Sequence, residues 1–385
     1  MSYLNEIALE RPVGTQNNTK INAYIREKSL INQLEVKTLD IDCFTWNKQE
    51  SYFKINNEKF TIFPSPFSTN YKGKLSIVIV SNNQELEKTD CENKLLILVG
   101  EICKNPLMPK DFPLYYPEED KYLIELIEKK NPAAILCFTG QHPMCGLNPF
   151  PLFEDGNFTI PSAYISSKYS QNLTNVFYGD LKICSEKIES KSEQLIIRKE
   201  NTSKEKIIIC AHMDTKYETN GAIDNAGGVA CLLELESLLK NYNGRYCIEI
   251  IPFNGEEYYG ISGQLKYMEY LQTISEKIKL VINIDAIGFK NSTLAVSKYN
   301  VSNCVEKKLE DIVNKDKKLN FGPEWIAGDH SMFAFQGIEC IALTSSNLFE
   351  EVIPITHTNK DTVDLLDYSL VKECAKSIFE IIISL

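Results

Sequence analysis

Five apolar residues run directly into a histidine and an aspartate in the segment Ile207-Ile208-Ile209-Cys210-Ala211-His212-Met213-Asp214. A short continuous apolar run is typical of a strand that is buried on both faces of a sheet. Open sheets of this kind, covered by helices, place their sites beyond the carboxyl ends of the strands. We therefore expect His212 and Asp214 to lie at such an edge.

The residues around this segment alternate between strand and helix patterns. Further strands are expected at residues 194–198, 246–253, 280–284 and 340–344, and helices at residues 227–239, 263–272 and 369–384. Such alternation favours a largely parallel sheet with helices on both faces. The predicted fold class is therefore α/β, with a mostly parallel or mixed twisted sheet flanked by helices. Helical spacing of apolar residues also predicts a helix within residues 2–35.

A second block of short strands lies between residues 59 and 180. Pro64-Ser65-Pro66 breaks the chain near its start, and apolar runs at residues 75–80, 95–99 and 133–138 predict buried strands. We expect residues 59–180 to form a smaller inserted α/β domain with its own core. Residues 1–58 and 181–385 would then form the main domain. A chain of 385 residues exceeds the size at which one core stops growing.

Composition and charge argue against several classes of partner. The chain has 41 basic and 52 acidic residues and a formal net charge of −11, whereas nucleic-acid binding needs clustered lysine and arginine. Its apolar runs are too short to cross a bilayer, and no secretory signal is visible. The twelve cysteines form no CxxC pair, and several fall inside predicted strands. We expect reduced thiols, a cytoplasmic protein, and neither nucleic acid nor membrane as a partner.

Side chains that can bind metal follow several of the predicted strands. They comprise two histidines, three aspartates and two glutamates: His212, Asp214, Asp224, Glu256, Glu257, Asp285 and His357. Carboxylates gathered at one sheet edge repel one another, and each would resist ionising unless cations neutralise them. Imidazole together with carboxylate suits zinc, with cobalt or manganese as weaker candidates. Each dipeptide alone carries little weight, but their joint occurrence predicts a metal site.

The order and spacing of these residues resemble peptidase family M28, a family of co-catalytic zinc peptidases. The resemblance rests on His212-x-Asp214, Asp224-Asn225, Glu256-Glu257, Asp285 and His357. Arg11-Pro12-Val13-Gly14-Thr15 is similar to the family's usual opening, and residues 59–180 resemble the protease-associated domain that some members carry. The resemblance implies a zinc-peptidase fold of the phosphorylase/hydrolase-like kind.

The resemblance also implies how two Zn²⁺ ions would be bound. One zinc would take His212 and Asp285, and the other would take Glu257 and His357. Asp224 would bridge both ions. Each metal would then have three protein ligands and an open position for water or substrate.

Further roles follow from the same resemblance. Asp214 would orient His212, and Glu256 would be the general base acting on a hydroxide that bridges the metals. The peptide bond between Asp224 and Asn225 is expected to be cis. The implied activity is that of a metallo-aminopeptidase, which hydrolyses the N-terminal residues of peptide substrates.

The sequence contains a second Asp-His pair, Asp329-His330. His330 follows Asp329, and because the resemblance already fills the ligand set, we interpret His330 as part of the wall and not as a ligand. Many family members have a tyrosine four residues before that pair, where it stabilises the oxyanion. This chain has Trp325 there, whose indole N–H can donate a hydrogen bond but which lacks a hydroxyl. The oxyanion contact therefore stays open.

Three other functions are alternatives to the aminopeptidase. A carboxypeptidase or dipeptidase would need an arginine for the substrate carboxylate, and Arg198 and Arg245, the arginines of the C-terminal half, lie away from the strand ends. Related glutaminyl cyclases use one zinc, whereas two histidines with a bridging Asp224 favour two. A non-catalytic, receptor-like binding protein is disfavoured because the ligands and the base are all present. The sequence predicts no oligomeric state and no side-chain preference.

Overall fold

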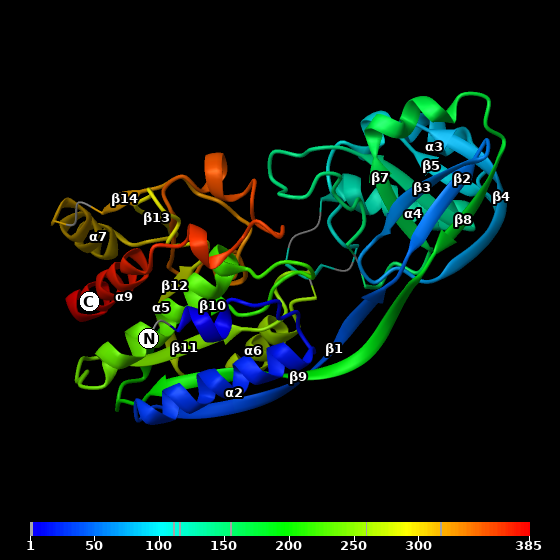
Figure 1. Ribbon diagram of the computed structural model, residues 1–385. Coiled ribbons are helices and arrows are strands. Elements are labelled where there is room, and N and C mark those ends of the chain that lie inside the picture. Colours follow the sequence, from blue (N-terminus) through cyan, green and yellow to red (C-terminus); the bar gives the residue numbers. More distant parts are fainter. Residues whose placement is uncertain (1–2, 111, 115–116, 155, 259, 316–317) are drawn as a thin grey trace. The chain divides into compact units, whose positions relative to one another are not determined.

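The chain divides into two compact units. The computed structural model describes residues 3–110, 112–114, 117–154, 156–258, 260–315 and 318–385 (Figure 1). Unit 1 comprises Met1–Cys43, Lys191–Glu257 and Ile261–Leu385, and unit 2 comprises Phe44–Ser190 and Tyr258–Gly260. Two of the divisions fall within long strands, β1 (Glu35–Lys48) and β9 (Ser185–Lys199). Each unit has its own buried apolar residues.

Unit 1 is built on an eight-stranded mixed sheet with the order β1-β9-β11-β10-β12-β15-β13-β14. Its four central strands run parallel: β11 (Cys247–Phe253), β10 (Glu205–His212), β12 (Lys277–Ile284) and β15 (Cys340–Ser345). The outer strands include antiparallel pairs, between β9 and β11 and between β15 and β13 (Leu294–Tyr299). The last strand, β14, spans Leu319–Phe321. The predicted α/β class with a mostly parallel or mixed sheet is confirmed.

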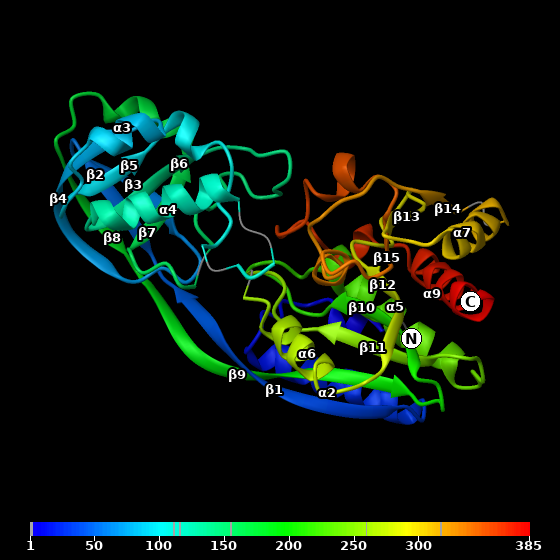
Figure 2. The ribbon, with the colours of Figure 1, turned by 180° about the vertical axis from the view of Figure 1, so that it is seen from behind.

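Helices cover both faces of this sheet. Helix α5 (Gly227–Leu239) packs against α9 (Tyr368–Ser384), and Figure 1 shows both in front of the central strands. Figure 2, from behind, shows α6 (Ser262–Leu271) on the opposite face. There Tyr267 packs edge-on against Phe253 and Phe333, the latter on the short α8 (Ser331–Ala334). The apolar side chains of β10 alternate between these two layers, which explains its continuous hydrophobic run.

Unit 2 is a closed barrel with the strand order β2-β3-β7-β6-β5-β4-β8. Four strands run parallel: β4 (Tyr71–Val80), β5 (Leu95–Leu98), β6 (Ala134–Thr139) and β7 (Ser162–Ser166). The antiparallel strands are β2 (Ser51–Ile55), β3 (Glu58–Pro64) and β8 (Tyr178–Ile183), and the helices are α3 (Asn83–Lys88) and α4 (Glu118–Lys130). The assignment of this unit as a protease-associated domain stays a prediction.

The N-terminal helix predicted within residues 2–35 is broken in two. Helices α1 (Leu4–Ile7) and α2 (Gln16–Ile31) are separated by residues 8–15, while Met1 and Ser2 lie outside the described residues. Thr15 begins α2 by accepting a hydrogen bond from the Asn18 N–H. The apolar periodicity did not reveal this cap.

Two global properties complete the fold. Within the described ranges, no helix is both long and apolar enough to cross a membrane. All twelve cysteines are free thiols, and nine of them are buried: Cys43, Cys91, Cys103, Cys137, Cys210, Cys231, Cys247, Cys340 and Cys374. This agrees with the expected reduced thiols.

Candidate metal centre

Three neighbouring parallel strands bring the candidate ligands to one edge of the sheet. His212 is the last residue of β10 and lies opposite Phe253 of β11. Glu256 and Glu257 follow β11 within four residues, and Asp285 follows directly on β12. Because parallel strands end at the same edge, residues far apart in sequence meet there.

Asp224 lies between the two histidines. Its Oδ1 atom is 2.9 Å from His212 Nε2, and its Oδ2 atom is 3.1 Å from His357 Nε2. The side chain of Asp224 is only 11% exposed. Each carboxylate oxygen therefore faces a different imidazole.

A second carboxylate accompanies each histidine. Asp285 Oδ1 is 3.5 Å from His212 Nε2, and Glu257 Oε2 is 3.0 Å from His357 Nε2. The site thus contains two groups, one of His212 with Asp285 and one of His357 with Glu257, joined by Asp224. The structure brings together all five residues that the sequence proposed as ligands.

A buried carboxylate oxygen without a partner suits a cation in this cluster. Glu257 Oε1 is buried and forms no hydrogen bond within the described part of the chain. Ligand atoms of His212, Asp224 and Glu257 all lie within 4.8 Å of one another. Imidazole nitrogen and carboxylate oxygen are the donors that zinc binds in catalytic sites. The residues present therefore fit zinc.

The electrostatics of the cluster are those of crowded, buried charges. Burial raises the pKa of Glu256 well above its ordinary value, and Glu257 and Asp285 add to that effect. Burial lowers the pKa of His212, but Asp285 and Asp224 outweigh it, so the pKa is raised well above the ordinary value. The same balance, with Glu257 and Asp224, raises the pKa of His357. Cations are favoured at this point, as the sequence predicted.

Asp214 holds the loop that carries the two glutamates. Its Oδ1 accepts a hydrogen bond from the Glu256 N–H at 3.1 Å, and its Oδ2 accepts one from the Glu257 N–H at 3.2 Å. The expected contact with His212 is longer than a hydrogen bond, at 3.9 Å between Asp214 Oδ1 and His212 Nδ1. Asp214 therefore ties β10 to the loop after β11.

The turn that carries Asp224 is fixed by its neighbours. A Cβ atom on Gly221, whose φ is +52°, would lie 2.3 Å from the Asp224 carbonyl oxygen, so glycine is required there. Asn225 accepts a hydrogen bond from the Gly228 N–H at the start of α5, and donates one to the Ile284 carbonyl beside Asp285. The bond between Asp224 and Asn225 is cis, as the resemblance implied.

Two buried residues of the site were not singled out by sequence reasoning. The Asp361 carboxylate accepts hydrogen bonds from the N–H groups of Ile223 and Asp224, at 2.7 and 3.0 Å. Arg11 lies fully buried behind the same turn and donates to its carbonyl groups. The resemblance to the family's opening gives Arg11 no role in the site. Four-residue spacing of Asp361 from His357 was the available signal, but it is not specific.

The second Asp-His pair lies beside the cluster. Asp329 is 4% exposed and accepts a hydrogen bond from Gln264 at 2.9 Å. Burial raises its pKa to about 7, against the opposing effect of His212. His330 Nε2 is 3.0 Å from the Trp325 carbonyl oxygen, and burial lowers the His330 pKa to about 4. His330 is therefore held by the loop and not by the five candidate ligands.

The fold and its cluster of imidazoles and carboxylates define the class of metal-dependent hydrolases built on a helix-flanked, mostly parallel sheet. Solved structures of this fold include an aminopeptidase from Aneurinibacillus sp. strain AM-1, with a TM-score of 0.77 and 19% identity over 98% of this chain and 91% of that chain. A zinc aminopeptidase from Bacillus subtilis gives 0.73, with 19% identity over 98% and 91%. A peptidase M28 precursor from Shewanella amazonensis gives 0.72, with 17% identity over 99% and 91%.

A match to a known family comes from the sequence. Residues 195–382, which contain every candidate ligand, match the family described as peptidase family M28. This match assigns residues 195–382 to peptidase family M28 and makes the protein a hydrolase that acts on peptides. A comparison with curated proteins gives no match.

Proposed function

We propose that the chain is an aminopeptidase that uses two zinc ions. The observation that carries the proposal is the position of Asp224, whose two oxygens face two different histidines at 2.9 and 3.1 Å. A carboxylate that faces two ligand groups in this way suits a bridge between two cations.

His212 and Asp285 would hold one zinc ion, Glu257 and His357 the other, and Asp224 both. Bound zinc would supply a water of near-neutral pKa and polarise the carbonyl of the scissile bond. The unpartnered, buried Glu257 Oε1 supports a cation at this position. Cobalt or manganese would suit the same donors less well.

Glu256 is the proposed general base. Its main-chain N–H is fixed by Asp214, while its side chain belongs to the partly exposed wall of the cluster. Glu256 would accept a proton from the attacking water and deliver it to the leaving amine. The raised pKa of Glu256 helps it to hold the proton between these two steps.

The arginines of unit 1 support a preference for a free amine over a free carboxylate, because each already has partners. Arg26 is paired with Glu193. Arg198 is paired with Glu276 at 2.7 Å, and Arg245 with Glu205 at 2.9 Å, near the start of β10 and so away from His212. Arg11 lies beside the cluster, but it is fully buried and its guanidinium donates to carbonyl groups. The acidic Asp329, by contrast, adds negative charge near Glu256. An ammonium group suits this environment.

The test combines metal content with substrate choice. We would measure zinc per chain by elemental analysis, and hydrolysis of aminoacyl chromogenic amides with free and with acetylated N-termini. Peptides with free and amidated C-termini form the matched set for carboxypeptidase activity. Each assay is repeated after chelation and after zinc is restored.

We expect two zinc ions per chain. We also expect cleavage only of the substrates with a free amine, and loss of that cleavage after chelation. Cleavage that requires a free C-terminus would replace the aminopeptidase with a carboxypeptidase on the same site. One zinc per chain would contradict the bridging role of Asp224, and no turnover of any substrate would contradict the peptidase activity proposed here.

A further inference from the structure

The turn that carries Asp224 is held from one side by a buried carboxylate. Asp361 is fully buried, and each of its oxygens accepts one main-chain hydrogen bond, from the Ile223 N–H at 2.7 Å and from the Asp224 N–H at 3.0 Å. Asp361 lies four residues after His357 in the same loop. One side chain therefore links the loop of His357 to the main chain of Asp224.

Arg11 holds the segment before this turn from another direction. Its Nη1 and Nη2 atoms donate to the carbonyl groups of Asn220 at 2.8 Å and Gly221 at 3.0 Å. Its Nε atom donates to the Met213 carbonyl at 2.6 Å, between His212 and Asp214. The planar guanidinium thereby fixes two stretches of main chain relative to each other.

The hydrogen bonds of both side chains go to main-chain groups. Both Asp361 oxygens are used by main-chain N–H groups, and Arg11 is 0% exposed. Most of these main-chain groups lie before or within the turn that carries Asp224. Their hydrogen bonds therefore act on the cluster through the main chain of the turn.

We propose that Asp361 and Arg11 are positioning residues for the metal-bridging carboxylate. Together they set the main chain of the turn so that the Asp224 oxygens point in two directions, one toward each histidine. This inference rests on the proposed two-zinc function. Partners that orient metal ligands in this way usually contribute about 10–100-fold to metal affinity or activity.

The test replaces Asp361 by asparagine in the full chain. Asp361→Asn keeps the size of the side chain but turns an amide NH₂ toward a main-chain N–H, so one hydrogen bond is lost. Zinc affinity is measured by competition with a chromogenic chelator, and the visible spectrum of the cobalt-loaded protein reports ligand geometry. Asp364→Asn is the matched control, because Asp364 is exposed and three residues away. Circular dichroism and thermal unfolding report the fold.

We expect Asp361→Asn to weaken zinc binding by at least about tenfold and to change the cobalt spectrum, with Asp364→Asn unchanged. A folded Asp361→Asn with wild-type zinc affinity and cobalt spectrum would overturn the inference, even if the wild type binds two zinc ions. If Asp361→Asn does not fold, the same two measurements are made on Arg11→Lys. This variant keeps the positive charge but lacks the planar guanidinium that donates to several carbonyl groups at once. Absence of zinc binding by the wild type would instead remove the proposed function, and this inference with it.

Discussion

At the scale of single residues, the two adjacent glutamates are expected to differ in role. Glu257 has an oxygen 3.0 Å from His357, whereas Glu256 belongs to the partly exposed wall. Glu256→Gln should keep two zinc ions per chain and lower kcat by at least about a hundredfold, because a general base usually contributes 10²–10⁴. Glu257→Gln is the comparison and should lose zinc. Zinc content and kcat together check this, and near-normal turnover by Glu256→Gln would remove it from the mechanism.

The same residues show what the sequence could and could not predict. His212, Glu257 and Asp285 were predictable because each follows a recognisable buried strand, and parallel strands end at one edge. Asp361 and Arg11 were not, because their contacts span 138 and 202 residues and carry no local pattern. The role of Asp214 toward His212 stays a prediction, whereas its hydrogen bonds to the loop of the glutamates are revealed only by the fold.

At the scale of elements, β10 and β11 share a buried ion pair. Lys206 and Glu249 are both 0% exposed and bonded to each other, and the Tyr267 hydroxyl donates to Glu249 at 2.9 Å. Lys206→Met should destabilise the protein by about 3–5 kcal/mol, because it leaves a buried carboxylate without its main partner. Urea unfolding checks this against Lys277→Met, an exposed lysine at the start of β12. Equal midpoints for the two variants would contradict the prediction.

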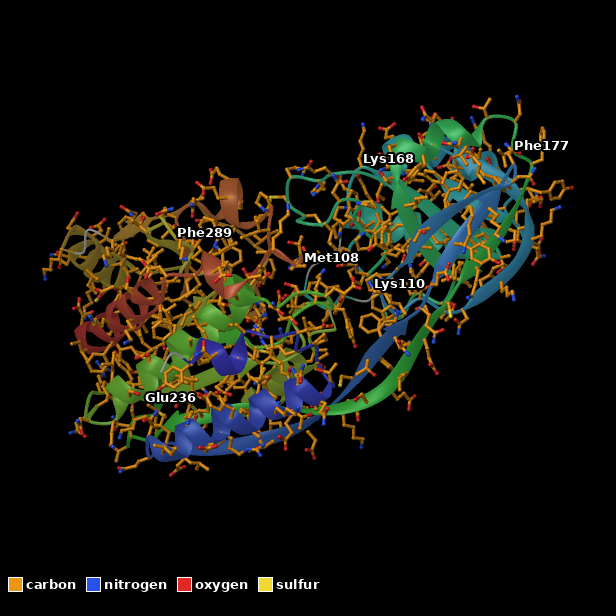
Figure 3. The ribbon with its side chains drawn as sticks, viewed as in Figure 1. Met108, Lys110, Lys168, Phe177, Glu236 and Phe289 are labelled. Carbon is orange, nitrogen blue, oxygen red and sulfur yellow. The ribbon has the colours of Figure 1, made fainter. Side chains whose placement is uncertain are left out.

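The packing of α5 against α2 should make stability depend on pH. Glu236, labelled in Figure 3, lies buried on α5 and accepts a hydrogen bond from Ser29 of α2 at 2.9 Å. Burial raises the pKa of Glu236 from 4.5 to about 8, against the opposing effect of Ser29 and Asn32. Between these values the unfolded chain loses this proton first, so the contribution is complete below pH 4.5 and declines as pH rises to about 8.

Glu236→Gln should remove this dependence. The wild type and the variant should have similar free energies of unfolding near pH 4.5. Above that pH, the free energy of unfolding of the wild type should drop below that of the variant by about 1.4 kcal/mol for each pH unit. Urea unfolding of both proteins at pH 5, 6.5 and 8 measures the difference. Parallel curves across this range would mean that Glu236 titrates at its ordinary pKa.

The elements of unit 1 were predicted unevenly. Helix α5 and the central strands agree with the expected ranges because apolar runs and flanking glycines define them. Helix α7 (Asn303–Lys315) was missed, although Val305, Leu309 and Ile312 recur at helical spacing and are buried. Strand β13 was missed because its run is short and pairs antiparallel at the margin of the sheet. Apolar periodicity predicts an element least well where only a few of its residues are buried.

At the scale of the whole molecule, the separate cores predict separate unfolding. Zinc would bind residues of unit 1 only, since His212, Asp224, Glu257, Asp285 and His357 all belong to it. A ligand that binds the folded form stabilises that form, by about 2.7 kcal/mol when its free concentration is 100-fold above Kd. We expect zinc to raise the unfolding temperature of unit 1 and to leave that of unit 2 unchanged.

The chain offers a direct way to see each unit. It has two tryptophans, Trp46 in unit 2 and Trp325 in unit 1. Trp46→Phe leaves fluorescence that reports unit 1, and Trp325→Phe leaves fluorescence that reports unit 2. Thermal unfolding of both variants, with zinc and with chelator, should show a shift only in Trp46→Phe, while calorimetry of the wild type should show two transitions of which one moves. Equal shifts in both variants would mean that the two cores unfold as one cooperative body, because stabilisation of one would then reach the other.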